Sequence, residues 1–323
     1  MSSTHEPEEP NEPIQDPDLP IVDPHHHLWP DYSIQDLHAD TRSGHNIVAT
    51  VFLECSSNYY TEGPHHLRPV GETDWAASQS VSGGMLSGIV GYANLTWGVS
   101  ELAEALDAHA EAGNGTFKGV RHTVAWDANP GVFASAHRPP PGLLLDSGFN
   151  RGAAELARRG LVYETWTYFH QLPALCDFAR AHPDLVVVLN HLGGPAATGP
   201  YSGRRREVLE EWRAGIKALE DVPHVVMKLG GIGMPAFTPA EFIESTPMTS
   251  ARIAKYWGPH IRYCIDTLGP ERCMFESNFP VDRRLCKYVT LWNSFKLIAA
   301  PYTRSERESL FAGTARRTYG IGS

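Results

Sequence analysis

The chain has 323 residues, of which 42% are hydrophobic and 20% are charged. This composition is typical of a globular protein and excludes a disordered or fibrous chain. The length accommodates one α/β barrel of about 250 residues with insertions. The 27 Lys and Arg residues against 37 Asp and Glu residues give a net charge of −10, which argues against nucleic acid as a partner. The unusual number in the composition is 16 histidines.

The sequence contains no apolar stretch of about 20 residues, so we expect no membrane-spanning helix. The opening residues, MSSTHEPEEPNEP, lack the basic and apolar regions of a signal peptide. The five cysteines are scattered and never spaced as CxxC, which favours reduced thiols. We therefore expect a cytoplasmic protein that does not bind a membrane.

Residues 1–20 differ in composition from the rest of the chain, because they combine acidic residues and prolines with no Lys or Arg. Such a segment buries no apolar surface, so we expect a disordered or extended leader. Residues 21–323 are expected to form one domain.

Beyond the leader, short apolar runs alternate with amphipathic helical patterns such as 99–111 and 203–219. The runs are rich in β-branched residues, as are strands buried on both faces of a parallel sheet. Eight such strands with helices between them predict a single (β/α)8 TIM barrel rather than an open doubly wound sheet. The predicted strands are 19–22, 47–54, 87–93, 116–120, 161–167, 185–189, 225–229 and 272–275.

Two long segments interrupt this alternation, 59–81 after the second strand and 126–150 after the fourth. Loops that follow barrel strands lie over the active-site face, so we expect both segments to form loops or lids there. They are equally compatible with a subunit interface, which leaves a homo-oligomer open.

The segment Asp23-Pro24-His25-His26-His27 ends the first predicted strand. Because strand side chains alternate, Asp23, His25 and His27 share one face and His26 points away. Two imidazoles at this spacing are suited to chelate one metal ion, or to donate together to an oxyanion. The other interpretation, a run of histidines in a surface loop, fits the strand context less well.

The segment IVDPHHHLWP resembles the opening of the amidohydrolase superfamily, in the branch of TIM-barrel hydrolases that includes sugar-lactone and dicarboxylate lactonases. Four further motifs follow in the family's order and extend the resemblance over the whole barrel. They are FKGVRH at 117–122, LNHLGGP at 189–195, VVMKLGG at 225–231 and FESNFPVD at 275–282. Together these motifs are specific for the family but not for a substrate.

His191 follows the apolar run LVVVLN at a predicted strand end. The resemblance implies that it is the family's sixth-strand histidine, which joins His25 and His27 as a metal ligand or an electrophile. The alternative is a histidine that caps the strand and bonds its neighbours. The expected cofactor is one divalent metal ion, Zn²⁺ or Mn²⁺, but the family also includes metal-free lactonases.

Asn278 occupies the position at which many relatives carry an Asp that is both metal ligand and general base. Asn cannot act as a base and binds a dication less well. The sequence therefore leaves undecided whether the protein binds a metal ion and which residue activates water. Glu276 and Asp282 are the candidates to replace that carboxylate. Glu276 is equally interpretable as the buried partner of Lys228, and Asp282 as the cap of a following helix.

Arg121 and His122 end the fourth predicted strand, and the resemblance implies that they bind substrate, with Arg121 anchoring a carboxylate. Alternatively, Arg121 neutralises nearby acids at the barrel rim. Lys228 and Glu54 are further candidates for substrate binding. Glu54, at the end of the second strand, is a candidate orienting group, or an ordinary carboxylate at the barrel rim.

Further aromatic and histidine side chains are candidates for binding. Trp166, Tyr168 and His170 share one face of the fifth strand, where they either line a substrate pocket or pack. The pair His65-His66 is a second metal site or an exposed pair.

We predict an enzyme that hydrolyses a lactone of a small molecule with a carboxylate or several hydroxyls. His25, His27 and His191 polarise the carbonyl, directly or through the metal ion. One alternative is metal-dependent nonoxidative decarboxylation, performed by a related branch that normally needs the eighth-strand Asp. Another is a barrel that has lost hydrolysis and acts as a lyase, a cyclase or a ligand binder.

Overall fold

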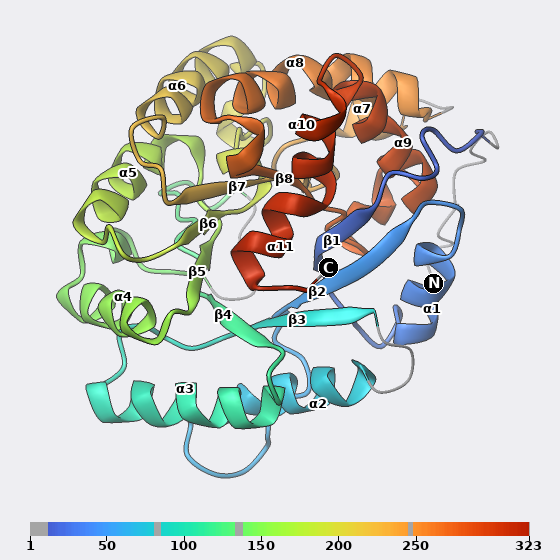
Figure 1. The fold of residues 1–323 in the computed structure, drawn as a ribbon. Helices are drawn as coiled ribbons and strands as arrows, with labels where there is room; N and C mark the ends of the chain where they lie inside the picture. The colour runs from blue at the N-terminus through green and yellow to red at the C-terminus, as the bar shows by residue number, and fades with distance from the viewer. Residues whose placement is uncertain (1–11, 81–84, 133–137, 245–247, 323) are drawn as a thin grey trace.

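The computed structural model describes residues 12–80, 85–132, 138–244 and 248–322. Within these residues eight parallel strands follow one another around a barrel in chain order, with helices on the outside (Figure 1). The predicted TIM barrel is therefore confirmed. The strands are β1 (Ile21–His26), β2 (Ile47–Leu53), β3 (Leu86–Gly91), β4 (Phe117–Arg121), β5 (Val162–Thr165), β6 (Val187–Leu189), β7 (Val225–Leu229) and β8 (Cys273–Phe275).

The barrel closes between its first strand and the residues that follow its last. Asn278 N donates to His25 O at 2.9 Å, and His27 N donates to Phe279 O at 2.8 Å. The chain just past β8 thus bonds to the end of β1, which brings their side chains to the same mouth of the barrel.

The helices run back along the outside of the barrel and cover the strands (Figure 1). Apolar residues of the helices and the outward strand faces form the larger hydrophobic core. The helices are α1 (Ile34–Thr41), α2 (Val70–Ser80), α3 (Val99–Gly113), α4 (Ser147–Arg159), α5 (Leu172–Ala181), α6 (Arg205–Ala218), α7 (Ala240–Glu244), α8 (Ser250–Leu268), α9 (Tyr288–Ala299), α10 (Arg304–Glu308) and α11 (Thr314–Tyr319).

Local sequence explains where several helices begin and end. The Ser33 side chain accepts from Asp36 N and the Asp36 side chain accepts from Ser33 N, a capping box that starts α1. Gly160 ends α4 in the left-handed conformation that glycine adopts without steric cost.

The two long segments are loops over part of their predicted lengths. Residues 70–80 of the first segment form α2, because the barrel's alternation of strand and helix continues there. In the second segment, residues 133–137 lie outside the described residues, and α4 begins at Ser147.

The predicted leader lies partly outside the described residues, which start at Glu12. The described part packs on the barrel. Gln15 N donates to Asn293 Oδ1 at 2.8 Å, and Lys296 Nζ donates to Asp16 O at 2.7 Å. Residues 12–20 are therefore held by side chains of α9 rather than extended into solvent.

The barrel interior is apolar at one end and charged further along the strands. Inward residues such as Val162, Val226 and Met274 form a second hydrophobic cluster with Tyr319 of α11. Figure 1 shows α11 lying across this end of the barrel. Two residues further along the same strands, alternation places Glu164, Lys228 and Glu276 inside, all fully buried.

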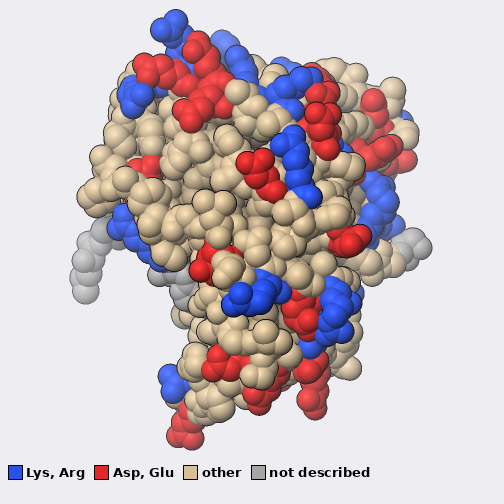
Figure 2. Space-filling model, turned by 90° about the vertical axis from the view of Figure 1, so that its left-hand side faces the viewer, with Lys and Arg blue, Asp and Glu red and all other residues tan. Residues whose placement is uncertain are grey.

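Charges on the outer face are mixed. Figure 2 shows Lys and Arg side chains interspersed with Asp and Glu, with broad uncharged areas between them. Arg159 of α4 illustrates this mixing, since it pairs with both Glu155 and Asp107. None of the described helices is both long and apolar enough to cross a membrane.

The closing helix suggests a test of stability. The Tyr319 hydroxyl donates to Glu164 Oε1 inside the barrel. In Tyr319→Phe this buried carboxylate loses a donor, so we expect the free energy of unfolding in urea to fall by about 1–3 kcal/mol. Tyr302→Phe is the matched control, because Tyr302 bonds Asp266 at the surface, and it should change stability by less than about 0.5 kcal/mol. Equal effects of the two variants would contradict this role of Tyr319.

Candidate active site

His25 and His27 lie at the carboxyl end of β1 with their rings close together. The two Nε2 atoms are 3.3 Å apart, and His27 Nδ1 is 2.9 Å from Leu53 O. A backbone carbonyl only accepts, so His27 carries its proton on Nδ1 and its Nε2 has a lone pair. His26 points away, as predicted, and its Nε2 contacts Thr50 Oγ1 at 3.1 Å.

The Glu276 carboxylate joins two of the candidate histidines. Its Oε1 is 2.8 Å from His191 Nδ1, and its Oε2 is 2.5 Å from His25 Nδ1. Glu276 and His25 are fully buried, and His191 is 3% exposed. A carboxylate at Nδ1 fixes ring orientation and places the proton there, so Nε2 of each ring presents a lone pair. Arg121 Nη1, which can only donate, lies 3.2 Å from His25 Nε2 and supports this tautomer for His25.

Burial controls the charges of this group. It lowers the pKa of His25 and the pKa of His27 well below their usual range, so both rings are neutral at pH 7. Burial raises the pKa of Glu276, but His25 and His191 outweigh this effect and hold the pKa well below its usual range. The site therefore combines the neutral imidazoles of His25 and His27 with the ionised carboxylate of Glu276.

Two glycines after β7 make room for these side chains. A Cβ on Gly231 would lie 2.4 Å from His191 Nδ1, and a Cβ on Gly230 would lie 2.3 Å from Glu276 Cγ. Real Cβ atoms do not approach other atoms this closely. The GG of the VVMKLGG motif is thus required by the close packing of His191 and Glu276 against the end of β7.

The backbone is strained at two candidate residues. His191 has a φ of 54° and Asn278 a φ of 54°, in the left-handed region that non-glycine residues adopt at a cost of about 1–2 kcal/mol. Strain of this kind concentrates at functional sites, where surrounding contacts maintain it.

Of the two interpretations of Glu276, the one that pairs it directly with Lys228 is wrong. Lys228 Nζ donates instead to Glu164 Oε2 at 2.7 Å and to Pro24 O at 2.8 Å. Glu164 lies directly within reach of Lys228, whereas Glu276 is occupied by the two imidazoles. Burial lowers the pKa of Lys228, and Glu164 partly offsets that effect.

Arg121 and Glu54 form one unit at the ends of β4 and β2. Arg121 Nε donates to Glu54 Oε1 at 2.8 Å, and Nη2 donates to Glu54 O. Two donors of the guanidinium are therefore engaged within the protein, and Nη1 faces His25. His122, the next residue, points to the outer side of β4, where its ring packs on Phe149 of α4 and its Nδ1 accepts from Leu95 N.

Asn278 and Asp282 are in direct contact. Asn278 Nδ2 donates to Asp282 Oδ1 at 2.9 Å, and both side chains are buried. Burial raises the pKa of Asp282 to about 8, although the amides of Gly233 and Ile232 and the Asn278 side chain lower it. Asp282 lies in the first turn of a 3₁₀ helix, Val281–Arg284, whose N-cap is Pro280.

The aromatic residues predicted on the fifth strand follow its end and form a row. The Trp166 ring lies 6.3 Å from the His191 ring and 5.3 Å from the Tyr168 ring, which stacks on His170. His170 Nε2 is 3.0 Å from Asp127 Oδ2. These rings extend from the buried His191 to His170, which is partly exposed.

Two groups of the site were missed in the sequence. Glu164 has the same strand parity as Trp166 and Tyr168, so alternation alone indicates that it faces inward. Tyr319, which bonds Glu164, gives no such signal, because its helix is far away in the chain.

His25 and His27 have the separation of two ligands of one dication. Two nitrogen ligands of a tetrahedral Zn²⁺, each about 2.0–2.1 Å from the ion, stand about 3.3 Å apart. The Nε2 atoms of His25 and His27 have this separation. Ligand atoms of His25, His191 and Glu276 also lie within 4.8 Å of one another. The 2.5 Å contact of Glu276 with His25 is too short for two ligands of one ion, so Glu276 fits an orienting role better.

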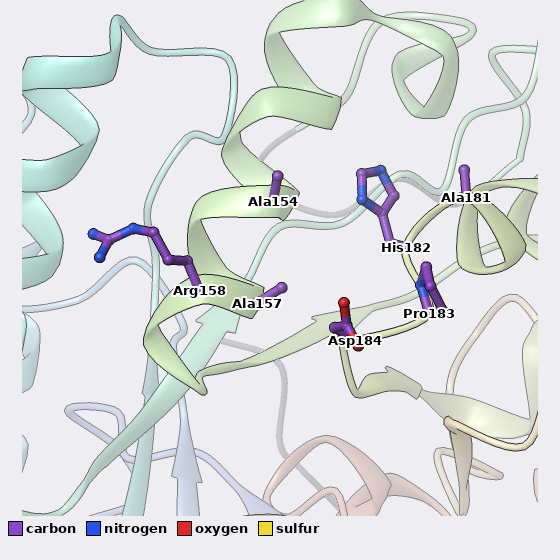
Figure 3. A pocket seen from close by; sticks show the side chains of 7 residues that line it. All are labelled: Ala154, Ala157, Arg158, Ala181, His182, Pro183 and Asp184. Atoms are coloured by element: carbon purple, nitrogen blue, oxygen red, sulfur yellow. The ribbon is translucent and has the colours of Figure 1, made fainter.

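A pocket on the outside of the barrel is unrelated to this site. It lies between α4 and the end of α5 and is lined by His182, Asp184 and Arg158 (Figure 3). Barrel helices run opposite to the strands, so their carboxyl ends mark the opposite mouth of the barrel from the histidines.

The sequence was compared with known proteins. A family model described as Amidohydrolase matches residues 22–321. The chain is 30% identical to an uncharacterized protein of Sinorhizobium fredii over 94% of this chain and 99% of that protein. It is also 30% identical to L-fucono-1,5-lactonase of Burkholderia multivorans, over 73% of this chain and 72% of the lactonase.

The fold is similar to solved structures. An amidohydrolase of Burkholderia multivorans, crystallised with bound Zn, superimposes with a TM-score of 0.72 at 24% identity, over 94% of this chain and 99% of that one. A Pseudomonas putida protein assigned as a 2-pyrone-4,6-dicarboxylic acid hydrolase gives a TM-score of 0.61 at 17% identity, over 94% and 98% of the two chains.

The raised pKa of Asp282 predicts a pH dependence of stability. The folded protein keeps this proton up to about pH 8, whereas an unfolded Asp releases it near pH 4. Between these values the folded state binds more protons, so this group lowers stability as the pH rises. Asp282→Asn removes the effect. As the pH rises, the free energy of unfolding of this variant minus that of wild type should increase by up to about 1.4 kcal/mol per pH unit.

Urea unfolding of both proteins across this pH range measures the difference. The exposed Asp177→Asn on α5 is the control and should run parallel to wild type. A constant difference between Asp282→Asn and wild type would show that Asp282 does not hold a proton in the folded state.

Proposed function

The chain belongs to the amidohydrolase family, and from this premise we propose that it hydrolyses a lactone of a small molecule that carries a carboxylate or several hydroxyls. The similarity to L-fucono-1,5-lactonase of Burkholderia multivorans supports a cyclic ester as substrate. The observation that carries the proposal is the Glu276 carboxylate between His25 Nδ1 and His191 Nδ1.

The tautomers favour a metal-assisted reaction over direct donation by the histidines. A neutral imidazole whose Nδ1 carries the proton has no Nε2 proton to offer a developing oxyanion. His27 meets this description, because Nδ1 faces Leu53 O and burial lowers its pKa. Lone pairs on the Nε2 atoms of His25, His27 and His191 suit a divalent metal ion, as in three-histidine zinc sites.

His25, His27 and His191 would hold the ion, and Glu276 would orient the first and last of them. When bound, a Zn²⁺ or Mn²⁺ ion polarises a carbonyl oxygen and lowers the pKa of a water molecule. The neutral Asn278 leaves such a site without an anionic ligand from the β8 end, which keeps the ion more electrophilic than a carboxylate would.

Asp282 is the better of the two candidate bases. Glu276 is occupied by two imidazoles, and its pKa lies well below its usual range. The pKa of Asp282 is about 8, so its ionised form, which acts as the base, becomes more populated as the pH rises from neutral toward 8. Through its contact with Asn278, Asp282 is joined to the strand end that carries the site.

Arg121 supplies positive charge at the same mouth. Its Nη1 faces His25, while Glu54 holds the rest of the guanidinium in place. We assign to it the attraction of a substrate carboxylate, with Glu54 as the positioning residue. Trp166 and Tyr168 offer an apolar wall beside His191.

A panel of sugar lactones, dicarboxylate lactones and aromatic carboxylic acids tests the reaction. Lactone opening releases a proton, whereas decarboxylation consumes one and releases CO₂, so a pH indicator separates the two. We expect acid release from a lactone, and a fall in kcat/KM of about 10²–10⁴-fold in His191→Ala. His182→Ala, at the end of α5, is the control and should keep the wild-type rate. Turnover of aromatic acids alone, with CO₂ release, would replace the lactonase assignment by the decarboxylase.

Asn278→Asp tests whether a metal ion binds beside residue 278. The new carboxylate would contact Asp282 inside the barrel, so without metal the free energy of unfolding should fall by about 2 kcal/mol or more. Zn²⁺ should then raise the Tm of this variant more than that of wild type, because an anionic ligand increases affinity. Asn293→Asp, a buried substitution beside the leader, is the control for the exchange itself. An equal Zn²⁺-induced shift of Tm in wild type and Asn278→Asp would place the metal away from Asn278.

A further inference from the structure

We propose that His65, His66 and Glu101 form a second site, which binds a divalent transition-metal ion of the Zn²⁺ class. The site lies outside the barrel interior, where the loop after β2 meets the start of α3. Ligand atoms of the three residues lie within 4.8 Å of one another.

His66 is the anchor of this site. It is only 7% exposed, and its Nε2 lies 2.8 Å from Glu104 Oε2. A carboxylate at this distance accepts the Nε2 proton, so the lone pair of the neutral ring is on Nδ1. Nδ1 has no hydrogen-bond partner among the described residues. A buried polar atom without a partner costs about 1–3 kcal/mol, and a metal ion would remove that cost.

Glu101 is the nearest acceptor on the other side of the site. Its Oε1 is 4.0 Å from His66 Nδ1, too far for a hydrogen bond. Two ligands of a tetrahedral Zn²⁺ stand about 3.3 Å apart, so a shift of a few tenths of an ångström at each side chain admits the ion. Glu101 Oε2 accepts from Gly98 N at 3.3 Å, which directs Oε1 toward His66.

His65 completes the set from the exposed side. Its ring is perpendicular to the His66 ring, with centroids 5.5 Å apart, and both rings contact Trp97 edge-on. An exposed third ligand leaves a coordination position for water. Two imidazoles, one carboxylate and a water are a ligand set of Zn²⁺ rather than of Mg²⁺ or Ca²⁺, which prefer oxygen.

The charge balance also favours a dication. Glu101 and Glu104 bring two carboxylates to the site, both within 4.0 Å of the His66 ring nitrogens. The N-terminus of α3 contributes the equivalent of about half a positive charge, which the two carboxylates exceed. A bound ion would join the loop after β2 to the first turn of α3, at the mouth of the barrel that holds His25 and His191.

Counting bound zinc tests the site on the full chain. Protein stripped with EDTA is dialysed against Zn²⁺, and the zinc per chain is measured by atomic emission. We expect His66→Ala, His65→Asn and Glu101→Gln each to bind one equivalent less than wild type. The readout is a difference between variants, so it does not depend on metal in the barrel. If His66→Ala does not fold, His65→Asn still tests the site, because His65 is exposed and its substitution should not disturb folding.

Glu104→Gln tests whether the hydrogen bond between Glu104 and His66 supports metal binding. Glu104 touches no ion in this arrangement but sets the tautomer of His66, so we expect the Zn²⁺ affinity of this site to fall by about 10- to 100-fold. His38→Ala on α1 is the matched control and should bind zinc as wild type does. Unchanged zinc content and unchanged Kd in His65→Asn and Glu101→Gln would overturn the proposal.

Discussion

The carboxylate of Glu276 occupies the centre of the barrel with no access to water, and an ionised group in such a place must be balanced by close donors. His25 and His191 provide them through their Nδ1 atoms, which settles the orientation of both rings. Much of the surrounding structure accommodates this contact. Gly230 and Gly231 leave space for it, and the left-handed backbone at His191 brings that ring to it. A larger residue at either glycine would separate the carboxylate from its donors.

A second buried pair, Lys228 with Glu164, lies inside the same barrel. Lys228 Nζ bonds Glu164 and Pro24 O, so the direct side-chain donors to Glu276 are imidazoles rather than an ammonium group. Tyr319 extends this arrangement to the helix that closes the far mouth of the barrel, since its hydroxyl donates to Glu164. The polar interior therefore connects the candidate site to the last helix of the chain. Inside the barrel, the apolar cluster with Val162, Val226 and Met274 packs at the end closed by α11. The charged side chains lie further along the strands, toward the mouth that holds the histidines.

Repetition along the chain made the barrel predictable, because eight β-branched runs alternate with amphipathic segments. Strand β7 matches its predicted bounds, and β8 differs from its predicted bounds by one residue. The choice of His25 and His27 over His26 also followed from local alternation, which holds for any strand. The extent of α2 was missed, since its Gly, Thr and Trp residues hide the helical pattern in a segment that resembles a loop. The packing of residues 12–20 was missed as well, because composition does not register contacts with Asn293 and Lys296.

The amino-acid sequence by itself determined the barrel and the family resemblance, because both depend on short-range patterns of spacing and motif order. It also predicted His25, His27 and His191 as one site, the first two from strand alternation and the third from the resemblance. The resemblance further implied that Asn278 replaces an Asp of the family. Only the tertiary structure decided which buried polar groups are in contact. Glu276 contacts His25 and His191, Lys228 contacts Glu164, and Asp282 contacts Asn278. Apart from Asn278 and Asp282, which are four residues apart, these partners come from strands and loops far apart in the chain. Their pairing is set by how the barrel closes, and a linear pattern carries no record of that closure.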